Sequence, residues 1–346
     1  MSYSPGSIET IEVDPVASSS SPEALSGLSV SISSDNRDDP PDAYGAKLSA
    51  GEAGGAGRVW LANHLFQRDP ITRAAFALSS TPRLGVALMA MNPFTIHPVQ
   101  LAMAAATLDE FHPGRVTLCL GSGSPGDLDT LALSHSKPLK PMQEALEICR
   151  ALLSGEKVRY EGEVYKVHDR LLATGRRPVP IYLAASRPRM LELAGSHADG
   201  VLISGGASVE FVRWSLEHVQ RGAAGRTVRA GSLVYAATAD DAAAVGRLRR
   251  LLAMLLRHPH HQHNMDVAGT VLDQQHLSAA VKAGDWASAD AMISDAVVDR
   301  HAIVGDPAQV LERLAAYRAA GLDEVVLAAT RDGEQIGKLL ACARTH

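Results

Sequence analysis

The sequence predicts an α/β fold in which eight parallel β-strands, each followed by a helix, close into a (βα)8 TIM barrel. The length of 346 residues suits one such barrel with insertions, since the barrel alone usually takes about 250 residues. Short apolar segments alternate with helical patterns along most of the chain, and this alternation is typical of parallel sheets. One stretch, residues 178–206, contains a complete strand, helix and strand.

Within that stretch, residues 179–185 form a short apolar run of the kind found in strands buried on both faces. Pro188 can begin a helix, because its missing N–H would have no partner in a first turn, and residues 201–203 form a second strand. Two strands joined by a short helix lie parallel with a right-handed crossover. Both strand ends and the helix N-terminus therefore face one edge, where we expect a ligand.

Six further strands complete the predicted barrel, at residues 28–33, 58–62, 84–91, 116–120, 228–237 and 324–328. Helices are predicted between them, among others at 69–80, 98–111 and 138–154. Residues 158–167 are expected to form a β-hairpin around Glu161 and Gly162 outside the barrel pattern. Residues 1–26, rich in serine and proline, are expected to be a disordered leader to a single domain, 27–346, with a helical insertion at about 240–298.

The composition is that of an ordinary globular protein, with 46% hydrophobic and 21% charged residues. A formal net charge of -5 argues against nucleic acid or an anionic membrane as the main partner. No apolar run reaches the roughly 18 residues of a membrane helix, and no signal peptide pattern is present. Cys119, Cys149 and Cys342 lie in apolar patterns without metal-like spacing, so we expect buried thiols and a cytoplasmic protein.

Several predicted strands are followed by residues that suit chemistry. His64 follows an early strand directly and is the best candidate for proton transfer at neutral pH, although an isolated histidine can also be structural. Ser186, Arg187 and Arg189 lie at a helix N-terminus that can bind an anion such as phosphate, unless the turn is an ordinary one with two solvated arginines. Gly121, Ser122 and Gly123 would let a ring or a phosphate approach the backbone.

The histidine-rich segment 258–263 invites a metal interpretation. It lies far from the predicted strand ends and has no cysteine or carboxylate at ligand spacing, so we expect no metal site there. The glycines after the strand at 116–120 also lack the later features of a dinucleotide fingerprint. A small molecule is the expected partner.

A set of segments distributed along the chain, at residues 60–64, 92–98, 106–110, 114–116, 152–156, 178–200 and 304–307, together resembles the bacterial luciferase-like superfamily. Within it, the chain is most similar to the deazaflavin-dependent methylene-tetrahydromethanopterin reductases. The resemblance implies the barrel already predicted and a bound coenzyme F-420, with FMN as the alternative. The residues it implies around the cofactor are Asn63, Met89, Asn92, Gly121, Ser122, Gly123, Ser186, Arg187, Arg189, Gly205 and Gly206.

The resemblance also implies that the insertion makes subunit contacts. Its apolar residues therefore predict a homodimer; they are Leu251, Leu252, Met254, Leu255 and Leu256.

Two carboxylates of related enzymes are missing. At the position of Ser33, the reductases that this chain resembles carry a catalytic glutamate. At the position of Ser124, related sugar-phosphate dehydrogenases carry another glutamate. Asp35 and His64 are then the catalytic candidates for supplying a proton. The expected function is hydride transfer between coenzyme F-420 and a C=N or C=C bond of a small metabolite. The alternatives are an FMN-dependent luciferase-like monooxygenase and a non-catalytic flavin-binding barrel.

Overall fold

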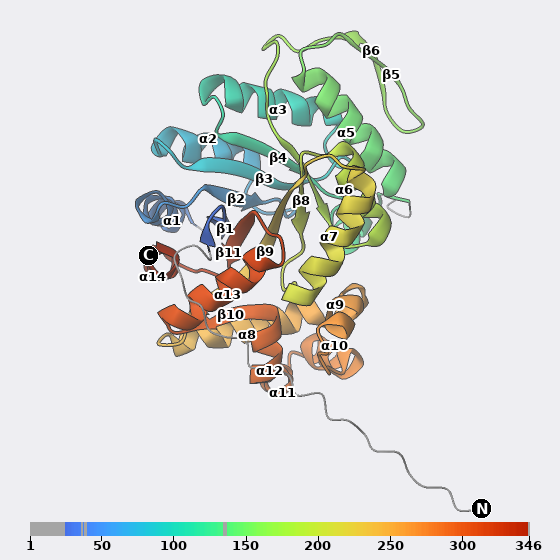
Figure 1. Cartoon of the computed structure of the whole chain (residues 1–346). Coiled ribbons are helices and arrows are strands. Elements are labelled where there is room, and N and C mark those ends of the chain that lie inside the picture. Colours follow the sequence, from blue (N-terminus) through green and yellow to red (C-terminus); the bar gives the residue numbers. More distant parts are fainter. Residues whose placement is uncertain (1–24, 36, 38–39, 134–136, 345–346) are drawn as a thin grey trace, which may run out of the picture.

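The computed structural model describes residues 25–35, 37, 40–133 and 137–344, so nearly all of the expected leader lies outside the described residues. Eight parallel strands close into a barrel, which confirms the predicted fold (Figure 1). The barrel strands are β1 (Ser29–Ser34), β2 (Arg58–Ala62), β3 (Gly85–Met91), β4 (Val116–Leu120), β7 (Ile181–Ala185), β8 (Gly200–Ile203), β9 (Arg229–Thr238) and β11 (Glu324–Ala328).

Strand β9 closes the barrel, because it pairs with β11 along one edge and with β8 along the other. Beyond β8, residues 235–238 of β9 pair with β10 (Ala302–Gly305), a short parallel strand that the sequence did not predict. The four residues of β10 follow directly on the helix that ends at His301, so no turn residue in the sequence marks where the helix ends and the strand begins.

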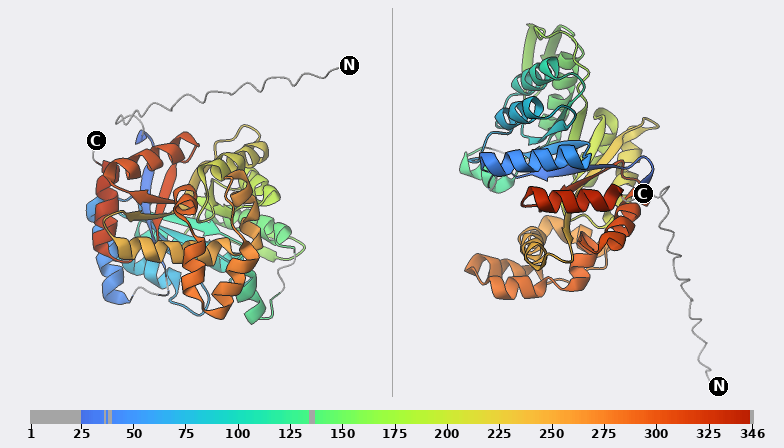
Figure 2. Two further views of the ribbon diagram at one scale, coloured as in Figure 1. Left: turned by 90° about the horizontal axis from the view of Figure 1, so that it is seen from below. Right: turned by 90° about the vertical axis from the view of Figure 1, so that its left-hand side faces the viewer.

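Helices surround the barrel on the outside (Figure 2). The outer helices are α1 (Pro41–Gly54), α2 (Pro70–Ser80), α3 (Pro98–Phe111), α5 (Leu139–Leu153), α6 (Pro188–His197), α7 (Val209–Ala223), α13 (Pro307–Ala319) and α14 (Gly333–Arg344). Several begin with proline after a capping residue; the Asp69 carboxylate, for example, accepts a hydrogen bond from Thr72 N at the start of α2. A further short helix, α4 (Pro125–Thr130), was not predicted.

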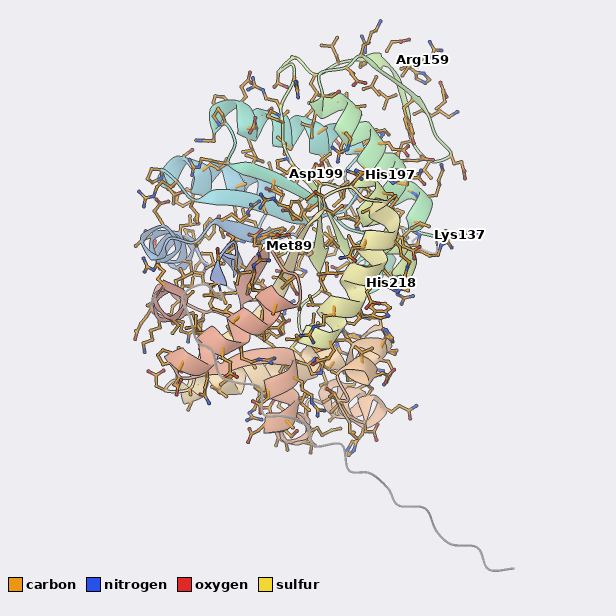
Figure 3. The ribbon with its side chains drawn as sticks, viewed as in Figure 1. Met89, Lys137, Arg159, His197, Asp199 and His218 are labelled. Carbon is orange, nitrogen blue, oxygen red and sulfur yellow. The ribbon has the colours of Figure 1, made fainter. Side chains whose placement is uncertain are left out.

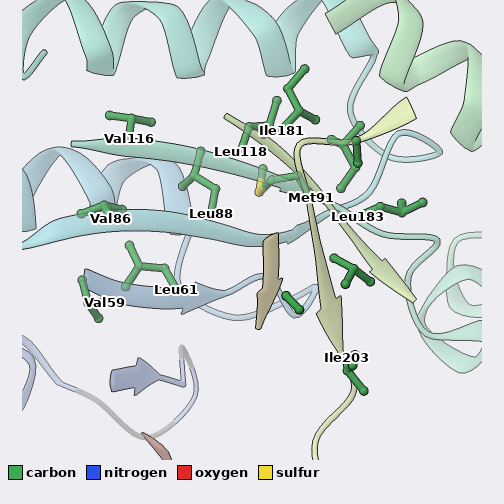
Figure 4. Close-up of a cluster of buried hydrophobic side chains, with 14 of the residues drawn as sticks. Val59, Leu61, Val86, Leu88, Met91, Val116, Leu118, Ile181, Leu183 and Ile203 are labelled. Carbon is green, nitrogen blue, oxygen red and sulfur yellow. The ribbon is translucent and has the colours of Figure 1, made fainter. Parts of the chain in front are cut away.

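Alternate residues of each strand point to opposite sides of the barrel wall. Those that face outward, such as Leu61 and Leu88, form the main hydrophobic core with the helices (Figure 4). Those that face inward form a separate core, which includes Trp60, Cys119 and Tyr182. This second core fills the interior of the barrel, as is usual for eight strands.

A buried polar network closes the amino-terminal end of the barrel. The Glu324 carboxylate at the start of β11 accepts hydrogen bonds from Ser31 Oγ at 2.5 Å and Trp60 Nε1 at 2.8 Å. Arg58 Nε lies 3.2 Å from the same carboxylate. Because every group in this network has a partner within it, we assign it to stability and look for the functional site at the opposite end.

The predicted hairpin is present as β5 (Val158–Glu161) and β6 (Lys166–Arg170), with its turn at residues 162–165 rather than at Glu161 and Gly162. The turn is held by the buried carboxylate of Glu144 in α5, which accepts hydrogen bonds from the backbone N–H groups of residues 163–165. Tyr165 then donates its hydroxyl to the carbonyl of Pro93 at 2.9 Å, which joins the hairpin to the loop after β3.

Five helices and a short 3-10 turn lie between β9 and β10: α8 (Ala242–Leu256), η2 (Pro259–His261), α9 (Gln262–Val267), α10 (Gln274–Ala283), α11 (Trp286–Met292) and α12 (Asp295–His301). They share a hydrophobic core of their own. Leu252 and Leu256 are fully buried in it, whereas Met254 is one of the exposed large hydrophobic side chains, at 37%. The apolar character of the two leucines is therefore explained within the chain, and the homodimer stays a prediction.

In the part of the chain that the structure describes, no helix combines the length and the apolar character needed to cross a membrane. Cys119, Cys149 and Cys342 are buried and form no disulfide, as their apolar surroundings predicted.

Acid should destabilise the protein through His261, which is buried in the insertion. Burial, reinforced by the charges of His260, His258 and His301, lowers the pKa of His261 to about 3. Because the unfolded state binds this proton near pH 6.5 and the folded state does not, stability is complete above that pH and falls below it. From about pH 7 to about pH 5 the free energy of unfolding should drop by about 2 kcal/mol from this group alone.

Thermal or urea unfolding at several pH values would measure this slope. The variant His261→Leu should flatten it, whereas His276→Leu, at an exposed histidine of α10, should leave it unchanged. An unaltered slope in His261→Leu would contradict the assignment.

Candidate functional site

The carboxyl ends of the strands form the open end of the barrel. Most inward-facing residues there are partly exposed, whereas those one layer deeper, such as Trp60 and Cys119, are fully buried. We call this end the mouth and define it by the inward-facing residues Ser33, Ala90, Gly121, Ala184, Leu233 and Tyr235. Ligands of parallel barrels bind at this end.

One wall of the mouth is made of small residues on the adjacent strands β3, β4 and β7. A Cβ atom added to Gly121 would lie 2.6 Å from Ala90 Cβ and 3.4 Å from Ala184 Cβ. Ala90 reaches this wall where the pairing register of β3 with β4 shifts, between Leu88 and Met91, next to the cis peptide bond from Met89 to Ala90. The wall is flat and apolar, which suits the face of a planar ring.

The opposite arc of the barrel, formed by β9, β11 and β1, is polar. Tyr235 of β9 presents its hydroxyl 3.5 Å from where a Cβ of Gly205 would be. Burial, and to a lesser degree the Asp35 carboxylate, raises the pKa of Tyr235 to about 12. The phenol therefore stays protonated at neutral pH and can act as a donor. The charge effect also shows that Asp35 lies within electrostatic range of the phenol, beyond the end of β1.

Tyr235 was missed by the sequence analysis. Its signal is the alternation along β9: Leu233 belongs to the inner core, Val234 and Ala236 belong to the main core, and Tyr235 therefore lies on the same side of the strand as Leu233. Tyr235 also packs against the core of the insertion. Asp35, a catalytic candidate, is exposed, and its Oδ1 accepts a hydrogen bond from Arg37 N at 2.7 Å.

At the end of β2, Asn63 and His64 have different surroundings. Asn63 donates from its backbone N to Met89 O at 2.6 Å and from Nδ2 to Ala90 O at 3.3 Å, so it supports the irregular end of β3. His64 is exposed, and the alternation through Trp60 and Ala62 assigns it to the inward face of β2. Met89 lies in the barrel interior at 8% exposure, just below the mouth (Figure 3).

The loops after β3 and β4 contact each other through Asn92 and Gly123. Asn92 is 5% exposed, and its Oδ1 accepts a hydrogen bond from Phe94 N at 2.8 Å. Gly123 has a φ of +76°, and a Cβ atom at this position would collide with Asn92 Nδ2. Ser122 is partly exposed between Gly121 and Gly123. The amide of Asn92 is thus engaged between the two loops.

The predicted anion site lies at the turn between β7 and α6. Ser186 is partly exposed, and Arg187 and Arg189 are exposed at the first turn of the helix. Burial, His258 and Arg187 each lower the pKa of His260. Arg187 therefore lies within electrostatic range of η2 in the insertion, which connects the anion site to a distant part of the sequence.

Gly205 and Gly206 differ although they are neighbours. Gly205 is partly exposed beside Tyr235, whereas Gly206 is buried against Leu255 and has a φ of +67°. The carbonyl of Gly206 accepts a hydrogen bond from Asn264 Nδ2 at 2.8 Å and lies 2.8 Å from His301 Nδ1. Gly206 is consequently part of the joint between barrel and insertion, outside the mouth.

The tautomer of His301 follows from these contacts. Burial lowers the pKa of His301 by more than the hydrogen bond with Gly206 raises it, so the ring is neutral. Nδ1 must then carry the proton that binds the carbonyl, and Nε2 accepts from Thr270 Oγ1 at 2.8 Å. A neutral, fully bonded histidine of this kind is a structural element.

Metal ligation finds no support in residues 25–35, 37, 40–133 and 137–344, which contain no group of three or more His, Cys, Asp or Glu side chains that could hold an ion. The histidine-rich segment instead packs by ring contacts. The rings of His258 and His260 stack with their centroids 5.5 Å apart. The ring centroids of His263 and Trp214 lie 4.2 Å apart.

Comparison with known proteins gives relatives with the same arrangement. The chain is 29% identical over 293 residues to 5,10-methylenetetrahydromethanopterin reductase of Archaeoglobus fulgidus, covering 82% of this chain and 87% of the relative. Its fold matches the solved coenzyme F-420-dependent tetrahydromethanopterin reductase of Methanopyrus kandleri, with a TM-score of 0.81 at 21% identity over 91% of this chain and 97% of that one.

A second solved structure, an F-420-dependent secondary alcohol dehydrogenase in complex with an F-420–acetone adduct, matches with a TM-score of 0.76 at 18% identity. It covers 92% of this chain and 99% of that chain. The family model for luciferase-like monooxygenases matches residues 27–324, which include every strand of the barrel up to the first residue of β11. The chain therefore belongs to the luciferase-like monooxygenase family, whose members related to it here are oxidoreductases.

Proposed function

We propose that the protein transfers a hydride between coenzyme F-420 and a C=N or C=C bond of a small metabolite. The observation that carries the proposal is the pair of unlike walls at the mouth, one flat and apolar, the other polar with a protonated phenol. The relatives support the cofactor, since two solved structures of the same fold are named as F-420-dependent enzymes. The Archaeoglobus fulgidus relative is named as a reductase.

The residues of the mouth fit a deazaflavin. The row of Ala90, Gly121 and Ala184 would hold one face of the ring, because a larger side chain at Gly121 would collide with its neighbours. Arg187 and Arg189 at the start of α6 would bind the cofactor's phosphate through charge and the helix dipole. When bound, the deazaflavin supplies a two-electron hydride carrier.

The polar arc would orient the substrate and supply the proton that hydride addition requires. Tyr235 is the donor that the geometry favours, because its hydroxyl is protonated at neutral pH and faces the mouth. Asp35 would sit beside it, and His64 is the second candidate at the end of β2. Ser33, in place of a carboxylate, leaves a small neutral side chain on β1, and this favours a substrate that brings no cation to that position.

The cofactor is tested by titrating the protein with F-420 and with FMN while following ring absorbance or fluorescence. We expect F-420 to bind more tightly. Ala184→Leu should weaken that binding by at least about tenfold, because an added side chain of this size displaces ring contacts worth more than about 1.4 kcal/mol.

A matched control is Ala75→Leu, an exposed alanine of α2, which should bind like the unaltered protein. Preference for FMN would favour the monooxygenase alternative. Affinity for neither cofactor would favour a non-catalytic barrel.

The proton donor is tested by Tyr235→Phe, which removes only the hydroxyl. We expect the rate of the reduction step to fall by about 10²–10⁴-fold, the usual contribution of a general acid, with little change in cofactor affinity. With a pKa of about 12, the phenol should also give a rate that is independent of pH across the neutral range.

Single-turnover rates of Tyr235→Phe, His64→Ala and Asp35→Asn, compared over pH, separate the candidates. If only His64→Ala loses the rate, the donor is the imidazole. Loss in Asp35→Asn alone would assign the carboxyl group.

A further inference from the structure

Phe66, in the loop between β2 and α2, combines high exposure with an unfavourable backbone conformation. Its side chain is 76% exposed, and its φ is +61°. This is the left-handed region, which glycine and asparagine enter readily and in which a bulky side chain is a genuine outlier. Phe66 is not among the residues that define the mouth.

No packing contact explains this conformation. Across the described ranges, Phe66 belongs to none of the three hydrophobic cores, and its ring contacts no other aromatic ring. Exposure does not require it either, since Phe111 is 74% exposed in the regular helix α3. The protein therefore holds an aromatic ring in water, in a strained conformation, without a gain within the chain.

The loop is fixed on both sides of Phe66. Before it, Asn63 donates from Nδ2 to Ala90 O at 3.3 Å. After it, Arg68 donates from Nη1 to Arg37 O at 2.6 Å, in the loop that follows β1. Strain that is kept by fixed surroundings is typical of functional sites, where it positions a group for its ligand in advance.

The loop borders the mouth between its two unlike walls. Strand β2 lies between β1, which belongs to the polar arc, and β3, which belongs to the flat wall. His64, two residues before Phe66, is on the inward face of β2. A substrate that lies between a ring on the flat wall and the donors of the polar arc would therefore lie beside the loop that carries Phe66.

We propose that Phe66 is a specificity-determining residue whose ring packs against a planar apolar group of the substrate, next to the C=N or C=C bond that is reduced. The inference rests on the proposed function, which places the substrate between the two walls. Contact with a flat apolar group would remove from water the ring surface that the free protein exposes. The substrate class is then a conjugated compound that carries an aryl or similarly flat group.

The experiment measures the binding of cinnamamide and crotonamide to the complex of the protein with F-420, followed by the fluorescence of the cofactor. Both amides are neutral and have the same conjugated C=C bond, but cinnamamide carries a phenyl ring where crotonamide has a methyl group. We expect the unaltered protein to bind cinnamamide at least about tenfold more tightly. Phe66→Asn should reduce this preference at least about fivefold, with little change in affinity for F-420 or crotonamide, and Phe66→Tyr should keep the preference.

Thermal unfolding gives a second result that a structural role would not produce. Asparagine adopts the left-handed conformation with less strain, so Phe66→Asn should raise the midpoint of unfolding by about 1–4 °C. A residue that served only the fold would lose stability when replaced. Opposite changes in stability and in affinity for cinnamamide therefore identify a ligand contact.

Two controls match the two features of Phe66. Phe111 is equally exposed but lies at the last residue of α3, at the amino-terminal end of the barrel, so Phe111→Ala should leave both amide affinities unchanged. Ala224 is the C-cap of α7 with a φ of +47°, at the same far end. Ala224→Asn should also raise the midpoint of unfolding and should leave binding unchanged.

An unaltered preference for cinnamamide in Phe66→Asn would overturn the inference, as would equal affinity of the unaltered protein for the two amides or no binding of cinnamamide. A lower midpoint of unfolding in Phe66→Asn would assign the residue to the fold, and a loss of F-420 affinity would assign it to the cofactor; either result overturns the inference. All these outcomes leave the proposed function standing, whereas failure of the unaltered protein to bind F-420 would overturn both.

Discussion

The rest of the structure depends on the pairing of β9, which is longer than the other barrel strands. Its ten residues pair with β11 on one edge, while the other edge binds first β8 and then β10. The pairing with β8 closes the barrel and brings all strand ends to one mouth. The part of β9 that extends beyond β8 presents Tyr235 there and, through β10, holds the end of the insertion against the barrel.

The insertion is consequently coupled to the mouth and is more than an appended domain. Asn264 of α9 and His301 of α12 both contact the carbonyl of Gly206, one residue after Gly205. Asn264 Oδ1 also accepts from Ser208 N at 3.1 Å. These bonds are buried, and leaving their partners unsatisfied would cost about 1–3 kcal/mol each. The loop beside Tyr235 is thus fixed by residues far away in the sequence, which couples the insertion to the mouth of the barrel.

The barrel could be predicted because its strands are apolar on both faces and its helices begin with proline or a capping residue, as at Asp69 and Pro188. Local patterns of this kind do not reveal β10, whose four residues become a strand only by pairing with the overhang of β9. Local patterns also do not show which residues meet at the mouth. Arg187 could be placed at a helix N-terminus from the sequence, but its proximity to His260 depends on how the insertion packs against the barrel.

In the proposed function, Tyr235 would supply the proton that the resemblance assigns to a carboxylate at the position of Ser33. Ser33 of β1 is neutral, Asp35 follows the end of that strand, and the low polarity around Tyr235 disfavours its ionised form. Burial therefore keeps a proton available at neutral pH where a carboxylate would need a raised pKa to do so. The proton source can move from one strand of the polar arc to another, since all strand ends meet at one mouth and each can reach the same bound substrate.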